Sequence, residues 1–206
     1  MKELTLFTAS MCLALALSGT ARADAITLTF DELPNQPVHG LAFMGVTFSF
    51  SMNGLPSLDA RFNAIGPDDG AYVQGSVLEG NAEGTLILDF AVPTSLLSFS
   101  VARNSLDVLM PGATIELFDP DLQSLGIFTL DTEPVFVFSE AQYIYSGTAV
   151  RRAMITFSNP GAADRFALDN LTFTQPVPEP STILLISTGL IALGIPTLKR
   201  KINGVW

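Results

Sequence analysis

The chain contains many short segments in which apolar and small polar residues alternate, and this pattern constrains its fold more than any other. Segments 26–30 and 46–50 carry an apolar residue at every second position, with threonine or serine between. A period of two is typical of a β-strand with one buried face. The same interpretation applies to segments 85–90, 96–103, 114–118, 125–130, 135–138, 149–157 and 166–173. No segment keeps a helical period over a dozen residues, so the sequence predicts an all-β fold.

Turn-forming residues separate these segments. Proline, glycine, asparagine and aspartate gather at 67–70, 110–112, 119–121 and 159–161, and such groups mark turns. Many short strands joined by turns favour a β-sandwich or a jelly roll. The stretch 24–175 holds fourteen of the fifteen phenylalanines, and its length suits one domain with a sizeable core. We therefore expect a single β-sandwich ectodomain over residues 24–175.

Residues 24–175 are strongly acidic. They include eighteen aspartates and glutamates, five arginines and no lysine, which gives a formal net charge of −13. The whole chain has a net charge of −10, because the terminal segments hold the other five basic residues and two further acids. An acidic surface repels nucleic-acid phosphates and anionic lipid headgroups. The charge excludes nucleic-acid binding, while divalent cations remain compatible with it.

Cysteine and histidine chemistry is nearly absent from this stretch. Cys12 is the one cysteine of the chain, and it precedes residue 24, so we expect no disulfide, thiol chemistry or cysteine–zinc site. His39 is the one histidine and follows Pro37-Val38 in an expected loop. A general base needs an oriented partner, so we interpret His39 as a solvated loop residue.

The N-terminus has the features of a secretory signal peptide over residues 1–23. Lys2 comes before an apolar run at 4–17, and Ala21-Arg22-Ala23 forms an A-x-A cleavage site. Ala23-Asp24-Ala25 offers a second cleavage site, so the mature chain begins at residue 24 or 26. We expect the protein to be exported.

The last thirty-one residues, 176–206, contain three elements in a fixed order. Val177-Pro178-Glu179-Pro180 comes first, an uncharged apolar run over 182–198 follows, and Lys199-Arg200-Lys201 comes last. A helix over the run would span about 26 Å, slightly less than a hydrocarbon core of about 30 Å. A basic cluster beyond an apolar run stops translocation on the cytoplasmic side. The pattern predicts a single C-terminal transmembrane helix that anchors the chain.

This order of elements resembles the PEP-CTERM sorting signal of bacterial proteins. The resemblance covers about thirty of the 206 residues and implies that an exosortase, a membrane-embedded protease, recognises Val177, Pro178, Glu179 and Pro180. It also implies transient anchoring in the inner membrane, with Lys199, Arg200 and Lys201 held inside, and release to the cell surface or the extracellular matrix. Pro196 and the extension 202–206 depart from the family pattern. A plain C-terminal anchor is the alternative.

The segment 166–173 predicts an irregular strand. Phe166 and Leu168 share one parity and Leu171 and Phe173 the other, so the inward face must switch across Asp169-Asn170, as a β-bulge would do. Together with Asp31 and Glu32 at the end of the first strand, Asp169 and Asn170 offer the oxygen ligands that calcium prefers. Similarity to jelly-roll carbohydrate-binding modules implies a structural calcium between first and last strands. The alternative is that these residues only cap a turn and break a strand.

Three functions remain open. The first is a non-enzymatic protein of the cell envelope or matrix, sorted by the tail. The second is a calcium-stabilised carbohydrate-binding module for exopolysaccharide, with Tyr143 and Tyr145 on one strand face as sugar platforms unless they cap the core edge. The third is a glycoside hydrolase with two opposed carboxylates. Neither a G-x-S-x-G nor an H-E-x-x-H motif occurs, and we expect no enzyme. No cofactor is predicted apart from the calcium.

Overall fold

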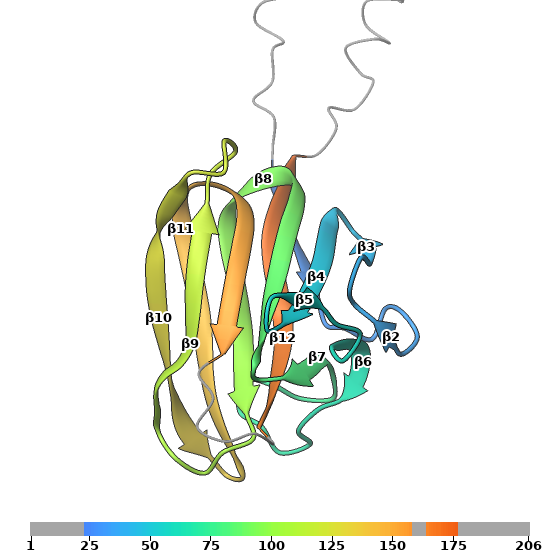
Figure 1. Ribbon diagram of the computed structural model, residues 1–206, viewed down its shortest axis with the longest axis vertical. Helices are drawn as coiled ribbons and strands as arrows, with labels where there is room; N and C mark the ends of the chain where they lie inside the picture. Colours follow the sequence, from blue (N-terminus) through green and yellow to red (C-terminus); the bar gives the residue numbers. More distant parts are fainter. Residues whose placement is uncertain (1–22, 158–163, 177–206) are drawn as a thin grey trace, which may run out of the picture. The chain divides into compact units, whose positions relative to one another are not determined.

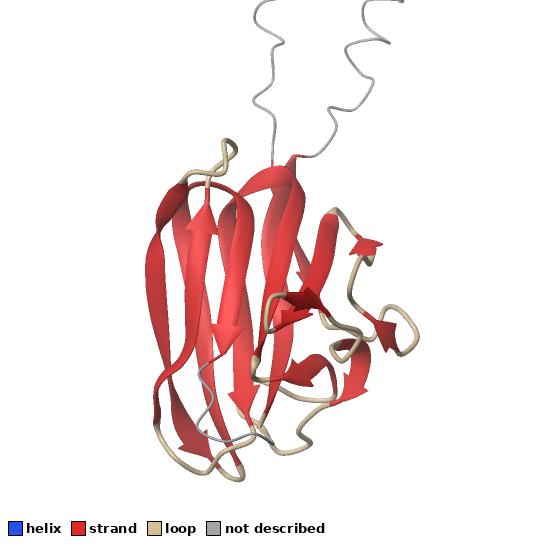
Figure 2. Ribbon diagram, in the orientation of Figure 1, coloured by secondary structure: helices blue, strands red, loops and turns tan. Residues whose placement is uncertain are grey.

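The computed structural model describes residues 23–157 and 164–176. These residues form strands joined by loops, and the described part of the chain contains no helix (Figure 2). None of the described segments is therefore a helix that could span a membrane. The twelve strands are β1 (Ala23–Leu28), β2 (Gln36–Pro37), β3 (Ala42–Phe43), β4 (Val46–Met52), β5 (Leu55–Pro56), β6 (Arg61–Ile65), β7 (Ser76–Asn81), β8 (Gly84–Arg103), β9 (Leu109–Phe118), β10 (Ser124–Val135), β11 (Phe138–Phe157) and β12 (Arg165–Pro176).

Two long strands, β8 and β11, each run through both layers of a sandwich (Figure 1). The first half of β8 lies between β4 and the second half of β11, where Phe48 pairs with Leu88. Its second half lies between β12 and the first half of β11. Both strands fold over at the same level (Figure 1), and their ladder has register shifts on either side of the pair Thr94 and Val150. The first layer continues through β9 to β10, and β12 of the second layer also pairs with β1 and β7.

The space between the layers is filled by aromatic and aliphatic side chains. Phe166 stacks on Phe157 with 3.8 Å between ring centroids, and Phe30 meets Phe62 edge to face at 5.0 Å. Inward residues of β8 such as Leu88 are fully buried in this core. Aromatic pairs in such geometries add to the energy of burial. The all-β fold and the phenylalanine-rich core that the sequence predicts are both confirmed.

Most of the predicted strands are present, and two local predictions are wrong. Segment 135–138 is a hairpin and not a strand: Val135 pairs with Phe138, and Phe136 turns the chain with a φ of 53°. Segment 110–112 belongs to β9 and not to a turn. The β9–β10 ladder is irregular there, with a register shift between Leu130 and Thr132, and this irregularity accommodates Pro111, which has no N–H to donate.

Residues Asp24–Gln175 form one compact unit, and the strands that begin and end it, β1 and β12, pair with each other. The hydroxyl groups of Thr27 and Thr172 lie 2.7 Å apart across this pair. Residues 1–22 of the predicted signal peptide, the turn at 159–161 and residues 177–206 of the C-terminal tail, with its sorting motif and basic cluster, lie outside the described residues.

Candidate functional surface

The predicted bulge in the last strand is confirmed. Asp169 pairs with Ser100 of β8, and Thr172 pairs with Ser98, so β12 gains one residue over its partner. Asn170 takes the extra position with a φ of 54°, a left-handed conformation that asparagine tolerates better than most residues. Leu168 and Leu171 consequently both face the core and are fully buried.

The bulge anchors a loop, residues 66–75, that crosses the outer face of the second layer. The backbone N–H of Tyr72 donates to Glu140 Oε2 at 2.7 Å, and the N–H of Gln74 donates to Asp169 Oδ2 at 3.3 Å. The Asn170 side chain donates to the carbonyl of Tyr72 at 3.3 Å. Under the loop, Glu140 is 2% exposed and Asp169 is 4% exposed.

Apolar packing seals the loop onto the sheet. Val73 is fully buried in a small cluster with Ala64, Val77, Ala102 and Ala167, separate from the main core. Gly70 is so tightly enclosed that an added Cβ would meet the carbonyl oxygen of Val73, within the loop, at 2.0 Å and Glu140 Oε1, on β11, at 2.6 Å. The loop thus has a fixed position that depends on glycine and on two buried carboxylates.

The environment of Asp169 favours its neutral form. Burial raises the pKa of Asp169, while the N–H groups of Asn170 and Gln74 act in the opposite direction. The negative charges of Glu32 and Asp31 raise the pKa further. The structure therefore brings the first and last strands close enough for their carboxylates to repel one another.

The four residues predicted to bind calcium have other partners in this structure. Asp31 accepts from the Thr29 hydroxyl at 2.8 Å, and Glu32 accepts from the Thr29 N–H at 2.7 Å. Asp169 and Asn170 hold the loop. Within residues 23–157 and 164–176, no three acidic, histidine or cysteine side chains converge as a metal site.

Calcium binding stays a prediction that titration would test. Calcium at a hundred times its Kd would add about 2.7 kcal/mol to the free energy of unfolding. An unchanged Tm, with no heat on titration, would contradict the hypothesis.

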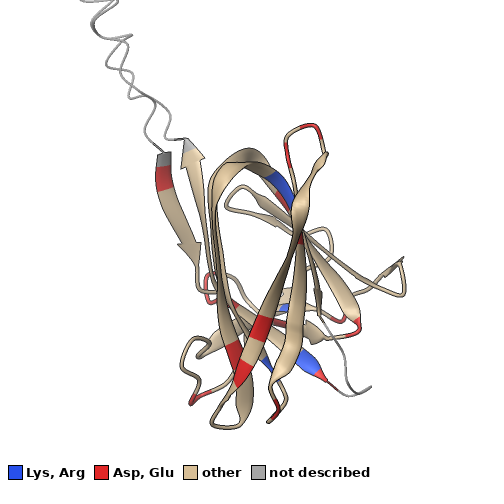
Figure 3. Cartoon of the chain, turned by 90° about the vertical axis from the view of Figure 1, so that its left-hand side faces the viewer, with Lys and Arg blue, Asp and Glu red and all other residues tan. Residues whose placement is uncertain are grey.

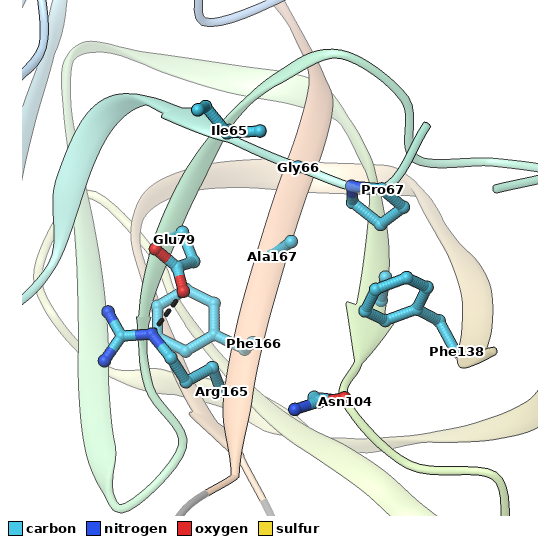
Figure 4. A pocket seen from close by; sticks show the side chains of 10 residues that line it. Ile65, Gly66, Pro67, Glu79, Asn104, Phe138, Arg165, Phe166 and Ala167 are labelled. Carbon is cyan, nitrogen blue, oxygen red and sulfur yellow. Dashed lines mark hydrogen bonds and ion pairs between the residues drawn. The ribbon is translucent and has the colours of Figure 1, made fainter. Parts of the chain in front are cut away.

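A pocket of about 230 Å³ opens on the outer face beside the start of the loop (Figure 4). Pro67 and Phe138 lie on one side, and the ion pair of Glu79 and Arg165 lies on the other, with Ala167 between them. Arg165 also contacts Asp59 at 3.3 Å. Burial lowers the pKa of Arg165, but Glu79 and Asp59 outweigh this effect and raise it.

A second, shallower hollow of about 130 Å³ lies on the same face. Phe99 and Tyr143 contribute to its lining, together with neutral side chains able to form hydrogen bonds: Ser98, Ser100, Gln142, Asn170 and Thr172. Of these, Ser100 is 1% exposed. Gln142 is exposed, and its Nε2 lies 3.5 Å from the Ser100 hydroxyl. Ile144, which is 70% exposed, supplies an apolar edge. We call this hollow the polar groove.

The two tyrosines predicted as sugar platforms pack toward the core. Tyr143 is 7% exposed, and its ring lies 5.1 Å from Phe99 and 6.2 Å from Phe128. Tyr145 also packs against Phe128, at 5.9 Å. Burial, with a smaller contribution from Tyr145, raises the pKa of Tyr143 to about 12. Both rings occupy the core edge, which is the alternative that the sequence left open, whereas Tyr72 on the loop is 44% exposed.

His39 has a structural role. Its Nδ1 lies 2.9 Å from the Phe50 carbonyl and 3.2 Å from the Phe50 N–H, which ties its loop to β4. The ring is partly buried and not simply solvated.

The sequence interpretation missed several residues of this surface. Glu140 resembles any other strand residue in the sequence, because its burial depends on a loop seventy residues earlier in the chain. The serines of the polar groove could have been assigned to an outer face, because Ser98 and Ser100 alternate with apolar residues in 96–103. Glu79 could not be found because β7 was not predicted, and Arg165 lies just before the predicted segment 166–173 with no pattern that points to a pocket.

Comparisons with known proteins give low similarity. No protein-family model and no curated protein sequence matches the chain. Among solved structures, a family 29 carbohydrate-binding module is similar at 13% identity and a TM-score of 0.40, over 74% of this chain and 89% of that one. A variant of such a module complexed with cellulohexaose has 12% identity and a TM-score of 0.40, over 78% and 100%.

An adhesin domain of Lys-gingipain from Porphyromonas gingivalis has 9% identity and a TM-score of 0.47, over 75% of this chain and 99% of that one. At these values none of the three assigns a function to the chain. The described residues form an all-β sandwich whose second layer carries two hollows separated by an anchored loop.

Proposed function

We propose that the chain is an exported protein of the cell envelope whose ectodomain binds a polysaccharide without catalysis. The observation that carries this proposal is the polar groove. Its serine, threonine, glutamine and asparagine side chains each offer both a donor and an acceptor. A sugar hydroxyl also donates and accepts, so such a surface matches it group for group.

The absence of charge in the groove supports a neutral, polyhydroxylated ligand. No ionisable carboxylate or cation is among the described residues that line it, although the domain as a whole is strongly acidic. Tyr72 lies close by, because its carbonyl accepts from Asn170 at the groove. Its exposed ring can stack on a sugar face, a role for which an aromatic ring with a polar tip is suited.

The binding experiment compares two glutamine variants. Gln142→Ala should weaken binding to the exopolysaccharide of the producing cell by roughly threefold to tenfold, because a net hydrogen bond contributes about 0.5–1.5 kcal/mol. Gln123→Ala, at the exposed turn between β9 and β10, is the matched control and should bind normally. Affinity electrophoresis in a polysaccharide gel measures both. An unretarded wild-type chain would overturn the proposal.

The proposal of binding without catalysis has its own test. A glycosidase requires two carboxylates across a cleft. Asp59 contacts Arg165 but does not line the larger pocket, and of the described residues that line it Glu79 alone carries a carboxylate. Arg165 already pairs with it. Incubation of the purified protein with matrix polysaccharide should release no reducing ends, and a steady release would make the protein a hydrolase.

The route to the envelope is a separate part of the proposal. We propose that an exosortase-like protease recognises Val177-Pro178-Glu179-Pro180 and releases the ectodomain after transient anchoring through 182–198 and Lys199-Arg200-Lys201. Intact-mass spectrometry of the protein from cells and medium tests this. A species that begins near Asp24 and ends near Pro180 is expected. A membrane-bound species that retains Trp206 would make the tail a plain anchor.

A further inference from the structure

The larger pocket is chemically two-sided, and the polysaccharide groove does not account for it. One wall is apolar and formed by Pro67 and the ring of Phe138, Ala167 lies between the two walls, and Ala102 also lines the pocket. The opposite wall carries the Glu79–Arg165 pair, and the side-chain amide of Asn104 lies at the rim (Figure 4). A ligand that fits must present a small apolar group beside polar ones.

The size of the pocket limits the ligand to one unit. At about 230 Å³, it is smaller than the ~300–1,000 Å³ of pockets for drug-sized molecules. One sugar ring with a small substituent matches this space. A longer oligosaccharide would have to leave the pocket and continue over the surface.

The local charge selects against an acidic ligand. Arg165 faces two carboxylates, Glu79 and Asp59, so the three groups together carry a charge of −1. The domain around them is also acidic. A uronate or a pyruvate ketal would bring a further negative charge to a site where Arg165, the one cation among the described lining residues, is already paired. The repulsion would weaken its binding.

An acetamido group has the required composition. It combines a methyl group, an amide N–H and a carbonyl oxygen in one plane. The methyl group would lie against Pro67 and Phe138, and the Asn104 amide, which has both donor and acceptor atoms, would pair with the polar edge. A hydroxyl in the same position would leave the apolar wall in contact with a polar group.

We infer that this pocket binds one neutral acetamido sugar residue of the polysaccharide. The inference rests on the proposed function, and it adds the class of sugar that the ectodomain selects. The polar groove, on the same face, contacts hydroxyl groups without distinguishing the substituent.

The experiment uses the full chain in a detergent that carries no sugar, and it follows binding by calorimetry. The probes are β-1,4-linked trimers of N-acetylglucosamine, glucose and glucuronic acid. The acetamido trimer should bind at least roughly fivefold more tightly than the glucose trimer, as one or two favourable contacts would give, and the glucuronate trimer should bind most weakly.

Two variants of Asn104 locate this preference. The Asn104 side chain is exposed, and the backbone bond from its N–H to the Arg165 carbonyl at 3.1 Å remains in any variant. Asn104→Ala and Asn104→Asp should both lower affinity for the acetamido trimer roughly threefold to tenfold and leave affinity for the glucose trimer within twofold. Gln142→Ala should weaken binding of both trimers equally.

The possible outcomes separate the two proposals. If the chain binds the glucose trimer as well as the acetamido trimer, or if the Asn104 variants bind like the wild type, the acetamido inference is wrong and the proposed function stands. If the chain binds none of the three trimers and also passes unretarded through the polysaccharide gel, both are wrong.

Discussion

Each half of β8 belongs to a different layer of the sandwich, so its outward residues allow the two outer faces to be compared. In the first half, Thr85 and Asp89 face outward and stay partly exposed, and Asp89 pairs with Arg152 at 2.7 Å. In the second half, the outward residue Ala102 is 1% exposed, because Val73 of the loop 66–75 packs in the same small cluster. One strand with one alternating pattern thus carries an open face and a covered face.

The difference shows that burial on the second face comes from the loop and not from the strand. Acidic residues demonstrate this most directly. Asp89 and Glu140 both face outward, yet the Asp89 side chain is 29% exposed and Glu140 is 2% exposed. Figure 3 shows how widely such acidic positions are spread over the domain and how few cations accompany them.

The largest expected loss of stability comes from a substitution in the core between the two layers. Phe166→Ala should lower the free energy of unfolding by about 3–5 kcal/mol, because the ring is fully buried and stacks on Phe157. Denaturant titration measures the change. Ile65 also lines the larger pocket but is 93% exposed. Ile65→Ala is therefore the control, and its free energy of unfolding should stay within about 0.5 kcal/mol of the wild-type value. Equal losses in the two variants would contradict this account of the core.

The second prediction separates the two faces. Glu140→Ala should cost about 1–3 kcal/mol, since it leaves the Tyr72 N–H without its buried acceptor. Hydrogen exchange should accelerate at Tyr72 and Gln74 and stay unchanged in β9. Asp89→Ala, on the open face, should cost less than about 1 kcal/mol. If Asp89→Ala proves as costly as Glu140→Ala, the loop does not distinguish the faces.

The third prediction concerns the pH dependence of the covered face. The pKa of Asp169 is raised in the folded protein above its ordinary value of 3.8, so folding favours the neutral carboxyl group. The stability that this preference contributes is complete at a pH below 3.8 and is lost as the pH rises through the pKa of the folded protein. Asp169→Asn removes this titration. The Tm of the variant should therefore fall less than that of the wild type as the pH rises above 3.8. Parallel curves for the two proteins would show that Asp169 titrates normally.

The smallest effect is expected at Tyr143. Its hydroxyl is buried and, among the described residues, has no hydrogen-bond partner, so Tyr143→Phe should leave stability unchanged or raise it slightly. Because the folded pKa is about 12, the wild type should lose stability as the pH rises from about 10 to 12, and the variant should not. A loss of polysaccharide binding in Tyr143→Phe would return this ring to the binding surface.

The sequence predicted what depends on local pattern and left out what depends on contacts between distant segments. The alternation in 46–50 and 85–90 was sufficient to place strands, and the parity change at Asp169-Asn170 was sufficient to place a bulge. The role of that bulge could not be predicted, since it anchors a loop from a hundred residues earlier through Gln74. The same reason explains why Glu140 was missed and why Tyr143, on an alternating strand, could not be assigned to its inner face.

The position of β12 determines how the domain would carry a mechanical load. The strand is hydrogen-bonded to β8 and β7 and also pairs with β1. A pull applied at Gln175 along the strand would act parallel to these neighbours and perpendicular to their hydrogen bonds. Many bonds would then share the force at once, instead of breaking one after another as they do when a strand at a sheet edge is peeled away. A domain tethered through this strand would resist shear from the fluid around a cell better than one tethered through an edge.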